Sequence, residues 1–315
     1  PALLSGNVYA EPSSKDTQAS VISLAKDLHA AQDPSFNYNL LQDCNLFNSK
    51  GICVSVMGAY TNVSNSNPDM IDGIFVVAKK FSDTLRIGGY IDQNIYTYNP
   101  LSSIQLENGY PSFGAFAVWN EKANGLGFQL RGVVGYSDKG LTLTRQAIGS
   151  SEAGSGETNL HTYTAALVAS HHTKMENFIL TPYLGVRYIK LYANGYTEER
   201  SDDVKSPLTY ESVGVDLYSA VSGLKLTHNF GKTAAIYASG GLEQDINNFS
   251  LSLSATGVDG LVPINSKGNF NSTRATATAG AYYNIDTTQR IGADLIWREE
   301  VFPSTSITTV LGKYT

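Results

Sequence analysis

From residue 51 to the end of the chain, apolar and polar residues alternate in runs that are separated by short turn sequences. The runs are rich in Val, Ile, Tyr, Phe and Thr, and turn formers such as Ser82-Asp83-Thr84 and Gly231-Lys232 stand between them. This pattern is typical of antiparallel hairpins. Twelve runs can be counted, near residues 51–63, 73–81, 85–97, 111–122, 126–146, 158–175, 177–198, 207–230, 233–256, 270–285, 289–303 and 305–315. The sequence therefore predicts an all-β domain of twelve antiparallel strands over residues 51–315.

The two faces of these predicted strands differ in an unusual way. Between Gly127 and Tyr136, the apolar Phe128, Leu130 and Val134 share one face, and Arg131 lies on the other. Seven charged residues fall on this second face: Arg86, Asp92, Arg131, Arg187, Glu243, Asp294 and Arg298. An unpaired ion in a dry core costs several kcal/mol, whereas a hydrated interior removes that cost. We therefore predict a barrel with an apolar exterior and take these seven residues as candidates that line its pore.

The connections between the strands are also asymmetric. One set has two to five residues, while the other includes long polar stretches such as residues 150–159 and 255–271. Outer-membrane barrels have short periplasmic turns and longer outer loops, and their strand number is even in bacteria. The pattern therefore favours a transmembrane β-barrel in a bacterial outer membrane.

Composition supports this reading. Only 16% of the 315 residues are charged and 42% are hydrophobic, whereas an ordinary globular domain has about 25% charged residues. The sequence has no run of eighteen apolar residues, so a membrane-spanning helix is excluded. The net charge of -6 gives no basic excess for binding nucleic acid.

The first fifty residues have a different pattern. Residues 1–14 are rich in turn formers and predict a linker, whereas residues 15–33 predict a helix with a narrow apolar stripe that includes Val21, Leu24 and Leu28. Ser13 or Ser14 can cap this helix, and Pro34 prevents its continuation. Residues 34–50 predict a connection to the first strand.

Cys44 in this connection and Cys53 in the first strand are a candidate disulfide. They enclose eight residues and have no further Cys or His at metal-binding spacing. A pair of reduced, partly buried thiols is the alternative that the sequence leaves open.

Motifs for catalysis or metal binding are weak. The five histidines share no ligand motif, and His171 and His172 would point to opposite faces of a strand. The sequence has no Gly-x-Ser-x-Gly turn and no phosphate-binding loop before a helix. The acidic pair Glu299 and Glu300 is expected to be a solvated strand end. We therefore predict neither an enzyme nor a metal or other cofactor.

Two stretches resemble a known family. TPYLGVRYIKLYANGYTEE at 181–199 is similar to a strand and loop of the carboxy-terminal translocator domain of classical monomeric autotransporters, the type V secretion proteins of Gram-negative bacteria. The last two segments, ATAGAYYNIDTTQRIGADLIWRE at 277–299 and ITTVLGKYT at 307–315, resemble the final hairpin and strand of that family. The resemblance covers residues 15 to 315.

The resemblance implies a twelve-stranded barrel with the amino-terminal helix inside its lumen. The helix would be the trailing end of a passenger, with residues 1–14 as the passenger end or a linker, and it would plug the pore by placing polar side chains against Arg131, Arg187, Glu243 or Arg298. Tyr314 would belong to the carboxy-terminal signal that is read by the barrel-assembly machinery. Some members cut their passenger with an Asn on the helix, but residues 15–33 have no Asn. The implied partners are the passenger, outer-membrane lipid and the assembly machinery, and the implied state is a monomer.

Three other functions compete with the translocator. A passive outer-membrane channel would not need a capped helix before the first strand, and a twelve-stranded outer-membrane phospholipase would need a paired Ser and His. A soluble all-β adhesin would fold without detergent. The alternating pattern of the sequence favours the barrel, and the family resemblance favours the translocator function.

Overall fold

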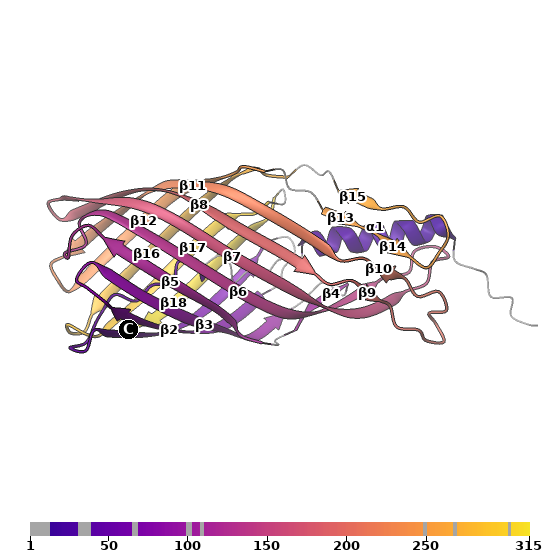
Figure 1. Ribbon diagram of the computed structural model, residues 1–315, viewed down its shortest axis with the longest axis horizontal. Coiled ribbons are helices and arrows are strands. Elements are labelled where there is room, and N and C mark those ends of the chain that lie inside the picture. The colour runs from indigo at the N-terminus through magenta and orange to yellow at the C-terminus, as the bar shows by residue number, and fades with distance from the viewer. Residues whose placement is uncertain are drawn as a thin grey trace, which may run out of the picture.

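A computed structural model of the protein describes residues 13–30, 39–64, 69–98, 103–107, 110–247, 251–266, 270–301 and 304–315. Within these ranges, only the backbone is described for residues 25–30, 251, 265 and 266. Long tilted strands enclose a lumen, and a helix lies at one end of it (Figure 1). The end with short connections is called the turn side, and the end with long connections and the helix is called the loop side.

Twelve strands form the barrel. They are β1 (Ile52–Val63), β2 (Asp69–Lys80), β3 (Leu85–Tyr98), β5 (Ser112–Asn120), β6 (Gly127–Arg145), β7 (Gly154–Met175), β8 (Phe178–Ala193), β11 (Val213–Phe230), β12 (Ala234–Asp245), β16 (Thr273–Asn284), β17 (Arg290–Glu299) and β18 (Ser306–Tyr314). Each strand pairs antiparallel with its neighbours, and β1 pairs with β18 from Val56 opposite Tyr314 to Val63 opposite Ile307. This last pairing closes the sheet and leaves it without an open edge. The predicted twelve-stranded antiparallel barrel is confirmed.

The two-residue period of the sequence decides which side chains face the lumen. In β1, exposed and buried residues alternate along nearly the whole strand. The outward Val54, Val56 and Tyr60 are exposed, whereas the inward Met57 and Ala59 are buried. The neighbouring strands present further exposed apolar side chains on the outside, including Phe75, Val77, Ile87 and Ile91. Such an exterior suits contact with lipid.

The barrel extends far beyond a bilayer at the loop side. β6 and β7 pair without interruption from Gly127 opposite His172 to Arg145 opposite Gly154, and about 9 to 11 residues suffice to cross the hydrocarbon core. Short strands gather at this end: β4 (Ile104–Leu106), β9 (Tyr196–Thr197), β10 (Thr209–Tyr210), β13 (Leu251–Leu253), β14 (Ala255–Thr256) and β15 (Ile264–Ser266). β4 pairs with β6, β10 lies between β9 and β14, and β13 pairs with β15.

The short strands differ from the sequence prediction, which placed β9, β10, β13 and β14 at the ends of long strands and left the residues of β4 and β15 outside every strand. The runs at 177–198, 207–230 and 233–256 are interrupted, and the barrel strands within them cover only Phe178–Ala193, Val213–Phe230 and Ala234–Asp245. At the first interruption, a Cβ on Gly195 would lie 2.7 Å from the backbone oxygen of Tyr210. The chain therefore turns there without a side chain, and Tyr196–Thr197 leaves the barrel to join β10.

The helix α1 (Ser14–Ala30) lies at the loop side among β10, β13 and β14 (Figure 1). The backbone N–H of Asp16 donates to the hydroxyl of Ser13 at 3.2 Å, so Ser13 is the N-cap. The prediction placed the helix at 15–33, of which residues 31–33 lie outside the described ranges. No helix in the described part of the chain is long and apolar enough to cross a membrane.

Candidate functional site: the closed lumen

The predicted pore-lining residues all lie at inward-facing positions of the barrel. Five of them, Arg86, Asp92, Arg187, Glu243 and Arg298, are buried, and the remaining two, Arg131 and Asp294, are half-buried. Five of them form two groups. Arg187 and Arg298 surround Glu243, whereas Arg86 and Arg131 contact residues 39–48 nearer the turn side.

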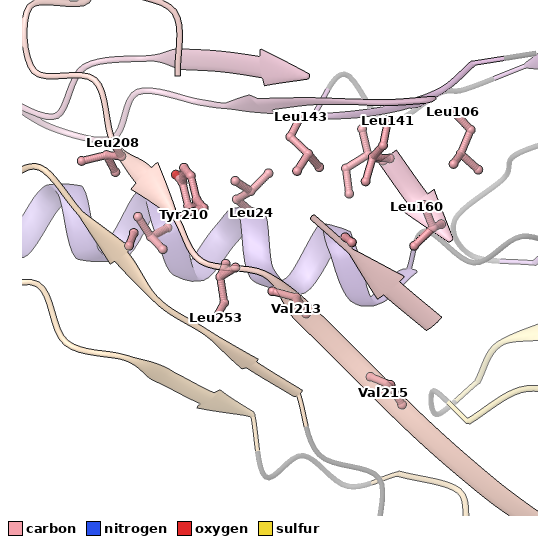
Figure 2. Close-up of a cluster of buried hydrophobic side chains, with 14 residues drawn as sticks. Leu24, Leu106, Leu141, Leu143, Leu160, Leu208, Tyr210, Val213, Val215 and Leu253 are labelled. Atoms are coloured by element: carbon pink, nitrogen blue, oxygen red, sulfur yellow. The ribbon is translucent and has the colours of Figure 1, made fainter. Parts of the chain in front are cut away.

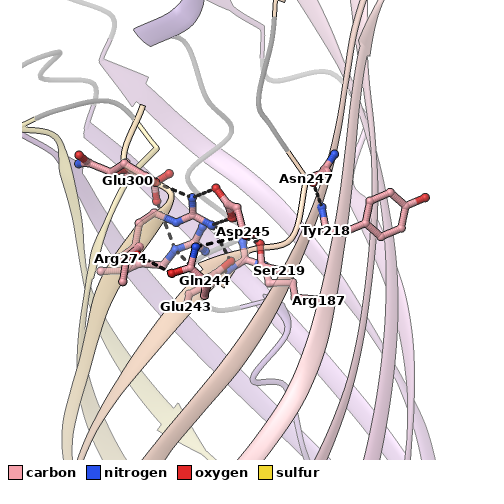
Figure 3. Close-up of polar contacts among 12 residues, drawn as sticks. Arg187, Tyr218, Ser219, Glu243, Gln244, Asp245, Asn247, Arg274 and Glu300 are labelled. Carbon is pink, nitrogen blue, oxygen red and sulfur yellow. Dashed lines mark hydrogen bonds and ion pairs between the residues drawn. The ribbon is translucent and has the colours of Figure 1, made fainter. Parts of the chain in front are cut away.

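The first group is an arginine cluster on β8, β12, β16 and β17 (Figure 3). Glu243 accepts from Arg187 Nη1 at 3.1 Å and from Arg274 Nη2 at 3.0 Å, and the Arg298 Nε lies 3.5 Å away. Arg274 also binds both carboxylate oxygens of Asp245, at 2.6 and 2.7 Å. These charges can remain buried because each carboxylate faces at least one guanidinium group.

Glu300 corrects one expectation from the sequence. It is only 2% exposed, and its Oε1 lies 3.5 Å from Arg298 Nε. The acidic pair Glu299 and Glu300 is therefore not a solvated strand end. Glu300 follows the last residue of β17 and continues the inward alternation of Ile296 and Arg298, which carries its side chain into the lumen.

Residues 39–48, here called the luminal segment, run inside the barrel near the turn side. Asp43 accepts a fork of two hydrogen bonds from Arg86, at 2.9 and 2.6 Å. Lys313 Nζ donates to the backbone oxygen of Asp43 at 2.9 Å, and Arg131 donates to that of Gln42. Three barrel strands thus hold one short stretch of chain.

A disulfide joins the luminal segment to the barrel wall. Cys44 and Cys53 are bonded, with their Cα atoms 5.8 Å apart, and each is 1% exposed. Cys53 is on β1, so the bond anchors the segment one residue after the Asp43 contact. The cysteines also pack with Met57, Ile74 and other inward apolar residues of β1, β2, β3 and β5.

The loop-side end of the lumen contains a second hydrophobic core, which surrounds α1. Val21 and Leu24 of the helix are each 2% exposed. They pack in one cluster with side chains from β4, β6, β7, β10, β11 and β13 and with Leu208, which precedes β10. The strand residues include Leu106, Leu141, Leu143, Leu160, Tyr210, Val213, Val215 and Leu253 (Figure 2). We call α1 and these surrounding elements the loop-side cap. The side chain of Leu28, the third predicted residue of the helix stripe, lies outside the described side chains.

A buried ion pair lies in the loop-side cap. Arg145 at the end of β6 donates to both oxygens of Glu198, at 2.7 and 2.8 Å, and each side chain is 1% exposed. Arg145 also donates to the Ser20 hydroxyl of α1 at 3.2 Å. Glu198 additionally accepts from the Leu208 N–H and the Tyr210 hydroxyl. The pair thereby links the helix, the barrel and the β9–β10 connection.

Protonation in the cap follows from this burial. Burial alone would lower the pKa of Arg145, but the hydrogen bonds and charge of Glu198 outweigh it and raise the pKa. Burial raises the pKa of the Tyr210 hydroxyl well above its usual range, and Tyr196 and Glu198 add to the effect. Arg145 therefore stays charged and Tyr210 stays a neutral donor.

The described part of α1 does not make the contacts that were expected of it. Its polar contacts go to Arg145, to Ser150 and to Val262, whose backbone exchanges two 3.0 Å hydrogen bonds with Gln18. Arg131 instead donates to the luminal segment, and Arg187, Glu243 and Arg298 pair within the arginine cluster. The physical reason is position: the apolar stripe of α1 packs in the loop-side core, and the chain that follows reaches the turn side as residues 39–48.

Tyr314 lies at the end of β18 and faces outward, with 48% of its surface exposed. Its hydroxyl donates to Gln289 at 2.9 Å, and its backbone is opposite both Val56 and Ile291. The carboxy-terminal aromatic residue is therefore on the exterior, at the seam where the barrel closes.

A serine and a histidine meet inside the lumen, which the sequence did not predict. Ser170 Oγ lies 3.2 Å from His172 Nε2, and Thr181 Oγ1 lies 3.1 Å from Nδ1 of the same ring. Both residues border an internal cavity. A phospholipase site needs access from the lipid, whereas this pair faces away from it. Among the described residues, no group of three or more His, Cys, Asp and Glu is placed to hold a metal ion.

Several residues of these sites were missed from the sequence alone. Arg274 follows the inward alternation of its strand, and this signal could have identified it. Asp43 lies in an irregular segment, and Glu198 lies beyond the end of β8, so no periodic pattern marks either residue.

These features define a class: a closed twelve-stranded membrane barrel whose lumen contains the chain that precedes its first strand. The model of the autotransporter beta-domain family matches residues 73–295, and the protein belongs to this family. The structure is similar to the translocator domain of autotransporter NalP from Neisseria meningitidis, with a TM-score of 0.62, 18% identity, and 98% of each chain covered. It is also similar to the beta domain of the Bordetella autotransporter BrkA, with a TM-score of 0.51 and 11% identity over 84% of this chain and 97% of that one. No curated protein matches the sequence.

Proposed function

We propose that the protein is an outer-membrane translocator that brings an amino-terminal passenger to the cell surface and is afterwards closed at both ends by its own chain. The family membership supports the transport role, and the exposed apolar exterior supports insertion in lipid. The observation that carries the proposal is the path of the chain: α1 lies at the loop side, and residues 39–48 reach the turn side before β1 begins.

A chain on this path would leave the lumen at the loop side in the direction of its amino terminus. A passenger attached there would therefore lie outside the cell if the loop side faces outward. The long loop-side hairpins and the short turns support that orientation. The seven inward charged residues would line the route, and Tyr314 would present the carboxy-terminal strand to the assembly machinery.

A display experiment tests the proposal. A small reporter domain is fused before residue 13 of the chain, and the fusion is produced in a Gram-negative host with an export signal. We expect added protease to remove the reporter from intact cells, while the barrel stays in the outer-membrane fraction. A folded barrel with its reporter retained in the periplasm would contradict translocation. Recovery of the chain as a soluble protein without detergent would favour an adhesin module.

The passive channel is the remaining alternative, and the contacts of the luminal segment disfavour it. An open channel gains nothing from a disulfide and a charge fork that hold chain inside its pore. The same fusion separates the two functions, because a passive channel would insert without exposing the reporter.

A further inference from the structure

An internal cavity of about 420 Å³ remains in the lumen between the luminal segment and the arginine cluster. Leu40 and Gln42 border it from the segment, and Arg187, Glu243 and Arg298 border it from the cluster. One water takes about 30 Å³ of the liquid, so the cavity has room for a small ion together with several waters.

The charges that border this cavity are unequal. Among the described residues, five cationic side chains line it, Arg131, Arg187, Lys225, Arg298 and Lys313, against the two carboxylates of Glu243 and Asp294. Both carboxylates already accept hydrogen bonds, Glu243 from two arginines and Asp294 from the Tyr237 hydroxyl. The wall therefore presents an excess of positive charge to whatever fills the cavity.

Arg187 has a donor edge that no described protein atom accepts. The side chain is 8% exposed and gives Nη1 to Glu243 at 3.1 Å, but its buried Nε and Nη2 have no hydrogen-bond partner. These two nitrogens lie on the same edge of the guanidinium plane. That edge is the one that binds two oxygens of a carboxylate, phosphate or sulfate side by side.

Other donors border the same space. The Nε of Arg131 is buried and has no hydrogen-bond partner among the described residues. The Lys225 ammonium lies 4.0 Å from the centroid of the Tyr237 ring. Ser239 and Thr276, which each carry a hydroxyl, line the cavity as well. The cavity thus combines net positive charge with donors that can complete the coordination of an anion.

We propose that this cavity binds a small oxyanion such as inorganic phosphate, with the Nε and Nη2 of Arg187 as its paired donors. The anion balances the excess charge of the wall and accepts hydrogen bonds from two buried donors that no described protein atom accepts. Phosphate binding at this site does not depend on transport of a passenger. A negative binding result would therefore leave the proposed translocator function untouched, and a negative display experiment would leave the site untouched.

The test is a titration of the full refolded chain with inorganic phosphate, followed by calorimetry and by the ¹⁵N-labelled Nε–H signal of Arg187. Sodium chloride at the same ionic strength is the reference, because chloride offers a single atom to the paired donors, whereas an oxyanion offers two oxygens side by side. We expect saturable binding at one site, a shift of the Arg187 signal that follows the same curve, and much weaker binding of chloride.

Three variants separate geometry from charge. Arg187→Gln should weaken phosphate binding by about tenfold or more, as the loss of a charge-assisted pair of hydrogen bonds implies. Arg187→Lys keeps the charge beside Glu243 but lacks the paired edge. Its affinity for phosphate should therefore lie between that of the parent chain and that of Arg187→Gln. Lys190→Gln removes a charge from the outward face of the same strand and should bind within about twofold of the parent.

Several results would overturn the proposal. These are the absence of saturable binding by the parent chain, equal binding by Arg187→Gln, and equal responses to phosphate and chloride. The Arg187 Nε–H signal of the parent chain tests the proposal even if a variant does not fold. If this signal does not move when phosphate is added, Arg187 does not bind the anion and the proposal is wrong.

Discussion

At the turn side, the lumen is occupied by an irregular segment that polar contacts and one covalent bond hold in place. Arg86 binds Asp43, Lys313 binds the backbone of the same residue, and Cys44 is bonded to Cys53. At the loop side, the lumen is occupied by a helix in a hydrophobic core, with the Arg145–Glu198 pair within it. The same chain thus occupies the two ends of one lumen through two different kinds of contact.

The difference has a physical origin. The turn-side segment lies next to the cavity, and its Arg86–Asp43 pair is more exposed than the Arg145–Glu198 pair, at 11% and 24% against 1% for each side chain. An ion pair that is closer to solvent is worth less. A covalent bond keeps its strength there. The loop-side cap excludes water, so apolar burial and a buried ion pair dominate, and removing one partner costs more. We therefore expect the cap to open cooperatively and the luminal segment to detach contact by contact.

The largest effect should come from Glu198→Ala. It leaves Arg145 buried without its partner, which costs about 3–5 kcal/mol, and it removes the acceptor of the Leu208 N–H. We expect the cap to lose amide protection from hydrogen exchange at β9, β10 and α1 while the barrel strands stay protected. Glu199→Ala, which removes an exposed carboxylate from the next residue, is the matched control. If the amides of the cap are equally protected from hydrogen exchange in Glu198→Ala and Glu199→Ala, the ion pair does not stabilise the cap.

Leu24→Ala should come next. It removes a side chain that is 2% exposed at the centre of the cap, and such truncations cost about 2–5 kcal/mol. We expect weaker protection of the amides of α1 and more frequent openings in single-channel recordings. Ile22→Ala changes a residue of the same helix that is 38% exposed, and it should leave both readouts nearly unchanged.

The disulfide is expected to contribute less, and at the other end. Replacing both cysteines, Cys44→Ser with Cys53→Ser, frees the luminal segment from β1 at a cost of about 2–4 kcal/mol. The Arg86–Asp43 fork remains, so we predict brief openings rather than a stable open pore. Protection of the cap amides should not change. Simultaneous loss of protection in the cap would mean that the two closures are one cooperative unit.

The smallest effect concerns Asp16, which accepts hydrogen bonds from the backbone N–H and the hydroxyl of Ser150, both at 2.9 Å. These hydrogen bonds, with the charge of Lys15, lower the pKa of Asp16 below its usual value near 3.8. Because the folded-state pKa is depressed, the contact stabilises the cap above the unfolded-state pKa and is lost as pH falls through the folded-state pKa.

The amide chemical shift of Ser150 measures this titration. In the parent chain it should titrate with a midpoint below the usual Asp pKa near 3.8, and in Asp16→Asn it should stay constant. A parent signal that titrates above pH 4 would show that the contact does not form.

The sequence predicted the barrel and its inward charges because both depend on local periodicity. Arg187 and Glu243 could be placed in the lumen from the alternation of their own strands, without knowing how the strands pair. Arg274 follows the same alternation, but its pairing with Glu243 depends on the register of β12 and β16, which places the two residues opposite each other. The position of the helix depends on packing between segments far apart in the chain, as in the contact of Ser20 with Arg145, and no local pattern records it.

The central claim is that the lumen has two separate closures, and planar-bilayer conductance tests it most directly. The full chain is compared with a chain that lacks residues 1–30 and with one that lacks residues 1–48 and also carries Cys53→Ser. We predict that loss of the helix alone gives small, intermittent conductance, since the disulfide and the Arg86–Asp43 fork still hold the luminal segment. Loss of residues 1–48 should give a large and stable open pore. A fully open pore after removal of residues 1–30 alone would contradict the account.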